Sequence, residues 1–180
     1  MKHWNKLLMV IGIVIVIIIG CLTLANKDQR SDDIVILYTN DVHTYIDKTL
    51  SYDHIAAIKN QLEEDYKYVY LVDAGDHVQG TGYGSMDQGE SIVKMMNAAE
   101  YDFATLGNHE FDYGMDGCMN VIDLAEYQYL SCNFYHEENN ERQNHVLKPY
   151  VVLDCGDESL AFIGITTPET FAKSTPKYFQ

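Results

Sequence analysis

The sequence predicts an α/β domain built on a mainly parallel sheet and preceded by an N-terminal hydrophobic helix. Three observations predict this fold class. Short continuous apolar runs alternate with amphipathic helical segments along most of the chain. Two further strand-like runs flank a turn towards the C-terminal end, and one long apolar run lies near the N-terminus. A β–α–β–α order is typical of a parallel sheet covered by helices.

The N-terminal apolar run is predicted to span a membrane. Lys2 and Lys6 precede an unbroken apolar run of 19 residues from Leu7 to Ala25. This run exceeds the ~7–15 residues of a secretory hydrophobic region and fits the ~17–25 residues of a spanning helix. The two lysines would hold the N-terminus in the cytoplasm.

Two other interpretations of this segment remain open, and all three export the rest of the chain. Thr23-Leu24-Ala25 could be a signal-peptidase site, and Ile18-Ile19-Gly20-Cys21 resembles a lipoprotein box that would be lipidated at its cysteine. We assign residues 1–26 to a signal or membrane anchor and residues 27–33 to a polar linker. Residues 34–180 are expected outside the cytoplasmic membrane and attached to it, or otherwise secreted.

The first half of the predicted domain alternates strands with helices. Continuous apolar runs are typical of strands covered on both faces, and apolar stripes are typical of helices that pack on them. Ile55, Ile58 and Leu62 share one helical face, with Ser51 as a plausible N-cap. In chain order, the elements are a strand at Ile34–Tyr38, a helix at Tyr52–Tyr66, a strand at Val69–Val72 and a helix at Ser91–Ala99, whose stripe is Ile92, Met95, Met96 and Ala99.

The second half continues this alternation and ends in a strand pair. It predicts a strand at Phe103–Leu106, a helix at Gly117–Glu126, a strand at Tyr129–Cys132, a polar surface loop at Phe134–His145, and strands at Tyr150–Asp154 and Leu160–Thr166 joined by a turn over 155–159. Sites in parallel sheets form beyond the carboxyl ends of the strands. The loops after the first three strands are therefore where we expect the chemistry.

Composition excludes some classes of function. Lys and Arg number 12 against 27 Asp and Glu, which gives a net charge of −15. No nucleic acid is expected as a main partner, because phosphate backbones bind basic surfaces. A phosphate-bearing substrate would need bound cations, so a metal is an early expectation. Cys118, Cys132 and Cys155 fit no zinc or disulfide pattern and are expected to be buried free thiols.

The loops after the first two strands carry candidate metal ligands. Asp41 and His43 follow the first strand, and residues two apart at an extended strand end point the same way. A carboxylate with an imidazole suits zinc, manganese, iron or cobalt better than calcium. Asp76 lies in a glycine-rich loop, where its two oxygens could reach two ions. A capped turn explains either aspartate equally well, and His77 is expected to be solvated or packing.

The loop after the third strand combines three chemistry-capable residues between glycines. Asn108 offers a neutral carbonyl ligand, which would limit the build-up of charge around a metal. His109 could act as a general acid or as a donor to the transition state. Asp112, three residues on, could fix the tautomer of His109.

Three motifs in order, T-N-D-V-H, G-D-H-V-Q-G-T and G-N-H-E-F-D, resemble those of the calcineurin-like metallophosphoesterases. Within that family the sequence looks closest to the secreted 5′-nucleotidase and 2′,3′-cyclic phosphodiesterase branch, which Ser131-Cys132-Asn133-Phe134 and residues 164–170 also resemble. The resemblance covers about Ile34 to Thr170. It implies a metallophosphoesterase-type β-sandwich flanked by helices and incomplete at the C-terminus.

The resemblance also implies a site and a reaction. The cofactors would be two divalent metal ions, zinc, manganese, cobalt or iron, and the substrate a nucleotide or another phosphoester. Asp41 and His43 would bind the first ion, Asp76 would bridge both, and Asn108 would bind the second. His109, held by Asp112, would stabilise the phosphoryl transition state during in-line attack by a metal-bound hydroxide.

Part of the family pattern has no counterpart in this sequence. The family completes its dimetal centre with histidines from later strands, including a Gly-His-x-His motif that does not occur here. His136 and His145 lie in the predicted polar loop and are expected to be solvated. Residues 34–180 are therefore expected to be the N-terminal part of a longer enzyme's domain, or the product of a truncated gene. Such a chain would hold a partial site, have impaired activity and leave an unpaired sheet edge.

Three functions remain open. The leading one is an exported, membrane-attached nucleotide phosphohydrolase of the 5′-nucleotidase type. The second is a hydrolase of cyclic nucleotides or nucleotide-sugars that uses the same centre. The third is a truncated, non-enzymatic surface protein that binds at most one metal through Asp41, His43 and Asp76.

Overall fold

The computed structural model describes residues 28–45 and 50–174 of the 180-residue chain. The chain divides into two compact units, Met1–Arg30 and Ser31–Gln180, and the second contains every element described below. The hydrophobic helix predicted within residues 1–26 lies outside the described residues. Within the described ranges, no helix is long and apolar enough to cross a membrane.

A four-stranded, fully parallel sheet forms the centre of the second unit. Its strands lie in the order β1 (Ser31–Thr39), β2 (Tyr66–Asp73), β3 (Phe103–Ala104) and β4 (Gln128–Tyr129). This order confirms the predicted parallel sheet. β1 begins inside the predicted linker, and β3 and β4 are shorter than the apolar runs suggested.

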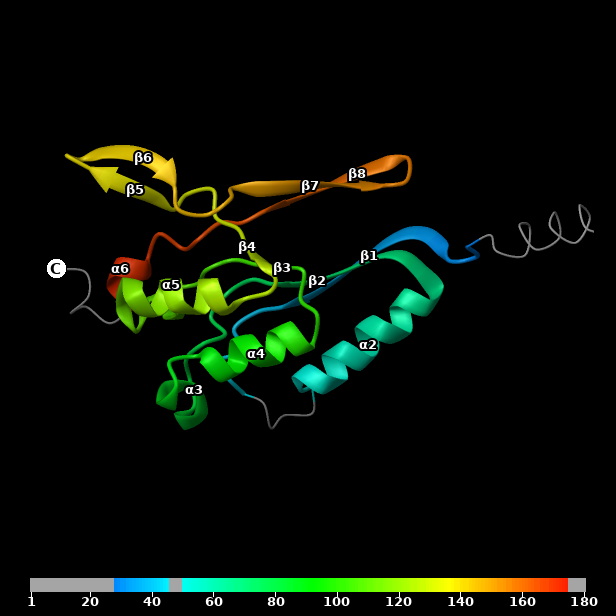
Figure 1. Cartoon of the computed structure of the whole chain (residues 1–180), viewed down its shortest axis with the longest axis horizontal. Helices are drawn as coiled ribbons and strands as arrows, with labels where there is room; N and C mark the ends of the chain where they lie inside the picture. Colours follow the sequence, from blue (N-terminus) through cyan, green and yellow to red (C-terminus); the bar gives the residue numbers. More distant parts are fainter. Residues whose placement is uncertain (1–27, 46–49, 175–180) are drawn as a thin grey trace, which may run out of the picture. The chain divides into compact units, whose positions relative to one another are not determined.

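Three helices cover one face of this sheet and enclose the core (Figure 1). They are α2 (Tyr52–Asp65), α4 (Glu90–Ala98) and α5 (Gly114–Leu124). Leu71 and Ala104 from the strands pack in one buried cluster with side chains from all three helices. The predicted stripe of α4 is confirmed, since Ile92 and Met96 are fully buried.

The buried face of α2 differs from the predicted one. Ile58 is 41% exposed, whereas Tyr52, Ile55 and Lys59 face the core. The Nζ of Lys59 lies 3.2 Å from a carboxylate oxygen of Asp102, so a buried charge is paired. A periodicity that counts only apolar residues cannot find a stripe that includes a lysine.

A β-hairpin covers the opposite face of the sheet (Figure 1). It consists of β7 (Tyr150–Cys155) and β8 (Glu158–Ile163), which are antiparallel as predicted. The ring of Phe162 lies 4.9 Å from that of Phe103 and 5.5 Å from that of Tyr70, measured between centroids. The domain is therefore an α/β fold with mixed sheets.

The polar segment predicted as a loop at 134–145 is a second hairpin, so that prediction was wrong. Its strands are β5 (Tyr135–Glu138) and β6 (Glu141–His145), joined through Asn139 and Asn140 with φ values of 55° and 63°. Asparagine tolerates these left-handed angles, which favour tight hairpin turns. Both strands are mostly exposed and polar, so no hydrophobic alternation marks them. His136 and His145 are exposed, as expected.

Three short helical elements were not predicted. They are α3 (Gly82–Met86), the 3₁₀ turn η1 (His109–Phe111) and α6 (Thr170–Lys173). Each is five residues or fewer and too short to show helical periodicity.

Candidate metal centre

The loops that follow β1, β2 and β3 meet at the carboxyl edge of the sheet. Asp41 and His43 come from the first loop and Asp76 from the second. One ligand atom from each of these three residues lies within 4.8 Å of the others. The edge-to-face contact between the rings of His43 and His109, with centroids 4.8 Å apart, brings the third loop to the same place.

The backbone brings Asp41 and His43 together in a different way from the one expected. Asp41, His43 and Asp76 have φ values of 53°, 50° and 59°, so they are left-handed rather than extended. Such a conformation costs on the order of 1–3 kcal/mol for a non-glycine residue and persists only where surrounding contacts enforce it. Two cross-loop bonds do so here: the Asp41 N–H donates to the Gly75 carbonyl (3.1 Å) and the His43 N–H to the Asp76 carbonyl (3.0 Å).

Two glycines allow the second and third loops to approach closely. Gly75 has a φ of 101°, and a Cβ there would collide with the backbone nitrogen of Gly107. A Cβ on Gly107 would in turn collide with the carboxylate of Asp76. The glycines noted in the sequence are therefore needed for the geometry of this site.

Asn108, His109 and Asp112 lie in and around η1. The His109 N–H donates to Oδ1 of Asp76 (2.7 Å), and its ring Nδ1 lies 2.6 Å from Oδ2 of Asp112. The Asp112 bond places the proton of a neutral His109 on Nδ1 and leaves Nε2 for another partner. Asn108 is buried, but in the described part of the chain no hydrogen bond joins its side chain to Asp41, His43 or Asp76. Its role as a ligand stays a prediction.

The electrostatics of this edge favour a cation. Burial raises the pKa of the Asp76 carboxyl, the backbone N–H of His109 opposes this, and the nearby carboxylates of Glu110 and Asp41 raise it further. A divalent ion beside these carboxylates would relieve their repulsion. Two carboxylates and one imidazole are also a donor set that zinc, manganese, iron and cobalt accept. The residues present therefore fit the metal that the sequence led us to expect.

Sequence reasoning missed a buried charged group beneath the metal centre. It contains Asp73, His77 and Glu110, all with side chains shielded from solvent. Of the two alternatives expected for His77, the packed one holds: the side chain is buried, its Nδ1 lies 2.7 Å from Oδ1 of Asp73, and its Nε2 lies 2.7 Å from the Tyr129 hydroxyl. Burial alone would lower the pKa of His77, but Glu110 and Asp73 outweigh it and raise the pKa to about 9. Nothing in the sequence predicted this burial, because His77 and Glu110 lie among polar loop residues, where charged side chains are usually exposed.

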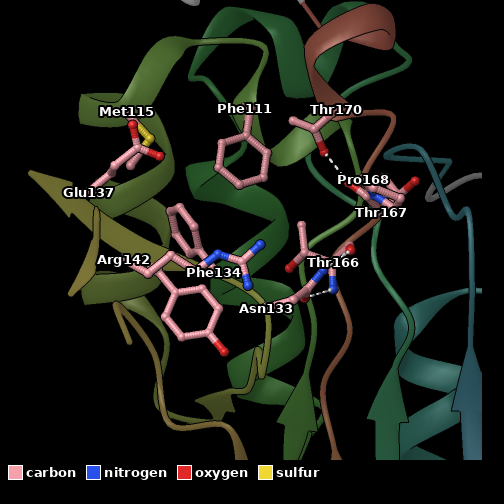
Figure 2. A pocket seen from close by; sticks show the side chains of 11 residues that line it. Phe111, Met115, Asn133, Phe134, Glu137, Arg142, Thr166, Thr167, Pro168 and Thr170 are labelled. Carbon is pink, nitrogen blue, oxygen red and sulfur yellow. Dashed lines mark hydrogen bonds between the residues drawn. The ribbon is translucent and has the colours of Figure 1, made fainter. Parts of the chain in front are cut away.

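A cavity of about 590 Å³ lies beside η1 but is not the metal centre (Figure 2). Phe111, Phe134 and Arg142 are among its walls, and none of the three clustered ligands lines it. Several of its polar groups already bond to one another. Asn133 donates to the Thr166 carbonyl (2.7 Å) and accepts the Thr166 N–H (2.9 Å). The candidate metal ligands Asp41, His43 and Asp76 lie instead at the carboxyl edge of the sheet.

Comparison with known proteins gives one consistent result. The model of the calcineurin-like phosphoesterase family matches residues 34–167. The snake venom 5′-nucleotidase of Gloydius brevicauda is 34% identical over 162 residues, which cover 81% of this chain and 27% of that protein. Human 5′-nucleotidase is 33% identical over 161 residues, covering 80% of this chain and 28% of that protein.

Solved structures agree with the sequence matches. The structure of Haemophilus influenzae NAD nucleotidase superposes with a TM-score of 0.70 at 28% identity, covering 79% of this chain and 28% of that one. The chain thus spans little more than a quarter of the length of these relatives. The matched range contains most of β1, all of β2, β3 and β4, and the loops that follow the first three strands, and this chain belongs to the calcineurin-like phosphoesterase family.

Proposed function

We propose that this chain carries part of the active site of a metal-dependent phosphoester hydrolase that acts on nucleotides. The observation that carries the proposal is the grouping of Asp41, His43 and Asp76 beside the His109–Asp112 pair. Family membership supports the reaction class, and the relatives named 5′-nucleotidase support the substrate class.

The described residues have separable roles in this proposal. Asp41, His43 and Asp76 would hold a first divalent ion, and Asp76 with Asn108 would reach a second. Divalent metals act in such sites as Lewis acids and make bound water acidic enough to react near neutral pH. The ligands that complete a dimetal site are proposed to lie outside this chain.

His109 is the proposed donor to the phosphate. Asp112 accepts the Nδ1 proton, so it is the protonated His109 ring that would use Nε2 to donate a hydrogen bond to a phosphoryl oxygen or a proton to the leaving group. The bond from the His109 N–H to Asp76 fixes the backbone of this residue against a ligand of the metal. The donor and the metal would therefore hold a fixed relative position.

We further propose that the chain is exported and is attached to a membrane through residues 1–26, or is secreted. The apolar run Leu7–Ala25 and the relatives named as snake venom proteins support export. A cyclic nucleotide or a nucleotide-sugar remains an alternative substrate, and the relative named NAD 5′-nucleotidase adds a dinucleotide to these candidates. A non-enzymatic surface protein with one metal is a second candidate, since three ligands suffice to hold one ion.

Metal binding and turnover together test these proposals. The chain is titrated with Mn²⁺ by calorimetry, and hydrolysis of 5′-AMP is followed with and without a chelator. We expect Mn²⁺ binding, and weak hydrolysis that the chelator abolishes. Metal binding without any hydrolysis, in this chain and in a longer form that supplies the remaining ligands, would favour the one-metal surface protein. A chain that binds no divalent metal would contradict both candidates.

A further inference from the structure

We propose that Glu110 is a positioning residue that ties the loop carrying Asp76 to the loop carrying Asn108 and His109. The inference rests on the proposed function, because it concerns the alignment of that site. Glu110 is not one of the metal ligands or proton donors discussed above. Its side chain is fully buried and is not among the three clustered ligands.

Three backbone N–H groups from two loops donate to the Glu110 carboxylate. Oε2 accepts from Asp76 (3.0 Å) and from Gly107 (2.6 Å), and Oε1 accepts from His77 (2.9 Å). Asp76 and His77 lie 34 and 33 residues away in the sequence, whereas Gly107 is three residues away. One side chain therefore accepts hydrogen bonds from both loops, the one after β2 and the one after β3.

A buried carboxylate is costly unless it is paired and fully hydrogen-bonded. His77 is a further polar partner of this group, with its Nδ1 3.5 Å from Oε1 of Glu110 and 2.7 Å from Oδ1 of Asp73. Its other nitrogen bonds to the Tyr129 hydroxyl on β4. The Glu110 carboxylate is thus linked through His77 to two residues of the parallel sheet, Asp73 and Tyr129.

The consequence for the site follows from the neighbours of Asp76. This residue is held at a φ of 59°, and its carboxylate accepts the His109 N–H at 2.7 Å. If the Glu110 bonds were lost, Asp76 could relax out of its left-handed conformation and release the bond to His109. Glu110 would therefore set the position of a metal ligand and of the phosphate donor at once.

A merely structural role makes a different prediction. If Glu110 only stabilised the fold, its loss would weaken the whole domain evenly, as loss of a core side chain does. Val121 on α5 is a matched control, because it is also fully buried but contributes an apolar side chain to the hydrophobic core. Glu110→Gln keeps the shape of the side chain but replaces one acceptor oxygen by a donor.

The test uses the full chain, first without metal. Amide hydrogen exchange is followed by NMR in the wild type, Glu110→Gln and Val121→Ala. In the wild type, the N–H groups of Asp76, His77, Gly107 and His109 should be protected. In Glu110→Gln they should exchange at least 10-fold faster while the amides of α4 stay unchanged. Fast exchange of these groups in the wild type would overturn the proposal, and so would an even loss of protection in Glu110→Gln.

Mn²⁺ binding supplies the second readout. Glu110→Gln should raise the dissociation constant of Mn²⁺ at least 10-fold, and Val121→Ala should leave it within 2-fold of the wild type. Equal affinities in the wild type and Glu110→Gln would overturn the proposal even if Glu110→Gln melts earlier. A wild type that binds Mn²⁺ and shows the expected exchange, but hydrolyses no phosphoester even in a longer form that supplies the remaining ligands, would refute the proposed function and leave the positioning role intact.

Discussion

His109 shows at the scale of one residue how neighbours assign a chemical role. Its ring contacts His43 at the metal centre, its Nδ1 is held by Asp112, and its side chain remains about a quarter exposed. Solvent and substrate can therefore reach the ring although its orientation is fixed.

His109→Ala should lower turnover of a phosphoester by about 10²–10⁴-fold, the usual contribution of a positioned proton donor. Mn²⁺ affinity should change little, because the ring is not among the three clustered ligands. Steady-state kinetics and calorimetry measure the two quantities. His136→Ala, which removes an exposed histidine on β5, is the control and should match the wild type. Equal turnover in both variants would contradict the role of His109.

Tyr52 offers a residue-scale test of stability. Its hydroxyl is buried and has no hydrogen-bond partner within residues 28–45 and 50–174. Tyr52→Phe should therefore raise the free energy of unfolding by about 1 kcal/mol, since a desolvated group is removed. Tyr101→Phe should lower it by a similar amount, because the Tyr101 hydroxyl lies 3.0 Å from Oγ1 of Thr39. Urea denaturation measures the free energy of unfolding of both variants. Changes of the same sign in the two variants would contradict this account.

At the scale of elements, the tight packing of the second and third loops depends on glycine. Gly75→Ala should cost about 2–4 kcal/mol of stability and weaken Mn²⁺ binding, because the left-handed φ and the contact with Gly107 both exclude a side chain. Gly82→Ala is the matched control, since among the described residues no atom outside its immediate chain neighbourhood lies within 4 Å of its Cβ position. Thermal melts and calorimetry distinguish them. If Gly75→Ala changed neither the stability nor the Mn²⁺ affinity, the close approach of the two loops would not matter for the fold or for the site.

How far the sequence predicts these elements depends on what shapes them. The parallel strands and the stripe of α4 were predictable because burial selects apolar residues at fixed spacing. The clustering of Asp41, His43 and Asp76 followed from parallel strand ends meeting at one edge. The role of Glu110 was not predictable, because two of its three backbone partners, Asp76 and His77, lie more than thirty residues away in the sequence. The β5–β6 hairpin was missed because neither strand buries an apolar face.

A layer of tyrosines between the sheet and its helices sets the alkaline limit of the fold. Burial raises the pKa of the Tyr52, Tyr101, Tyr127 and Tyr129 hydroxyls well above their ordinary value near 10. The unfolded chain therefore loses these protons at lower pH than the folded chain. The resulting stability is fully present below pH 10 and is lost as the pH rises above it, by about 1.4 kcal/mol per pH unit for each phenol.

We expect cooperative unfolding between about pH 11 and 12, because a domain holds only ~5–15 kcal/mol of stability. Tyrosinate absorbance and circular dichroism are recorded together during a pH titration. The signal of the four buried phenols should appear with the loss of circular dichroism, after the exposed tyrosines have titrated. If all 14 tyrosines titrated near pH 10 in a folded chain, the claim that burial raises the pKa of these four hydroxyls would be wrong.

At the scale of the whole molecule, two opposing properties decide whether copies of the chain associate. Several large apolar side chains on β1, on the β7–β8 hairpin and just after it are exposed. Tyr38 is 74% exposed, and Ile36, Val152, Ile163 and Ile165 are each at least 45% exposed. β1 is also one of the two edge strands of the parallel sheet. Apolar surface and a sheet edge both favour self-association. The net charge of −15 opposes it by repulsion between copies.

Salt should therefore promote association rather than suppress it. The Debye length falls from about 10 Å at 0.1 M salt to about 3 Å at 1 M, which screens the repulsion and leaves apolar burial unopposed. Sedimentation velocity across this range should show a growing oligomeric fraction. Replacing Val152 and Ile163 by asparagine should reduce that fraction at high salt, while Asp157→Asn in the hairpin turn should not. Association that weakened as salt was added would show instead that complementary charges, not the exposed strand faces, hold the copies together.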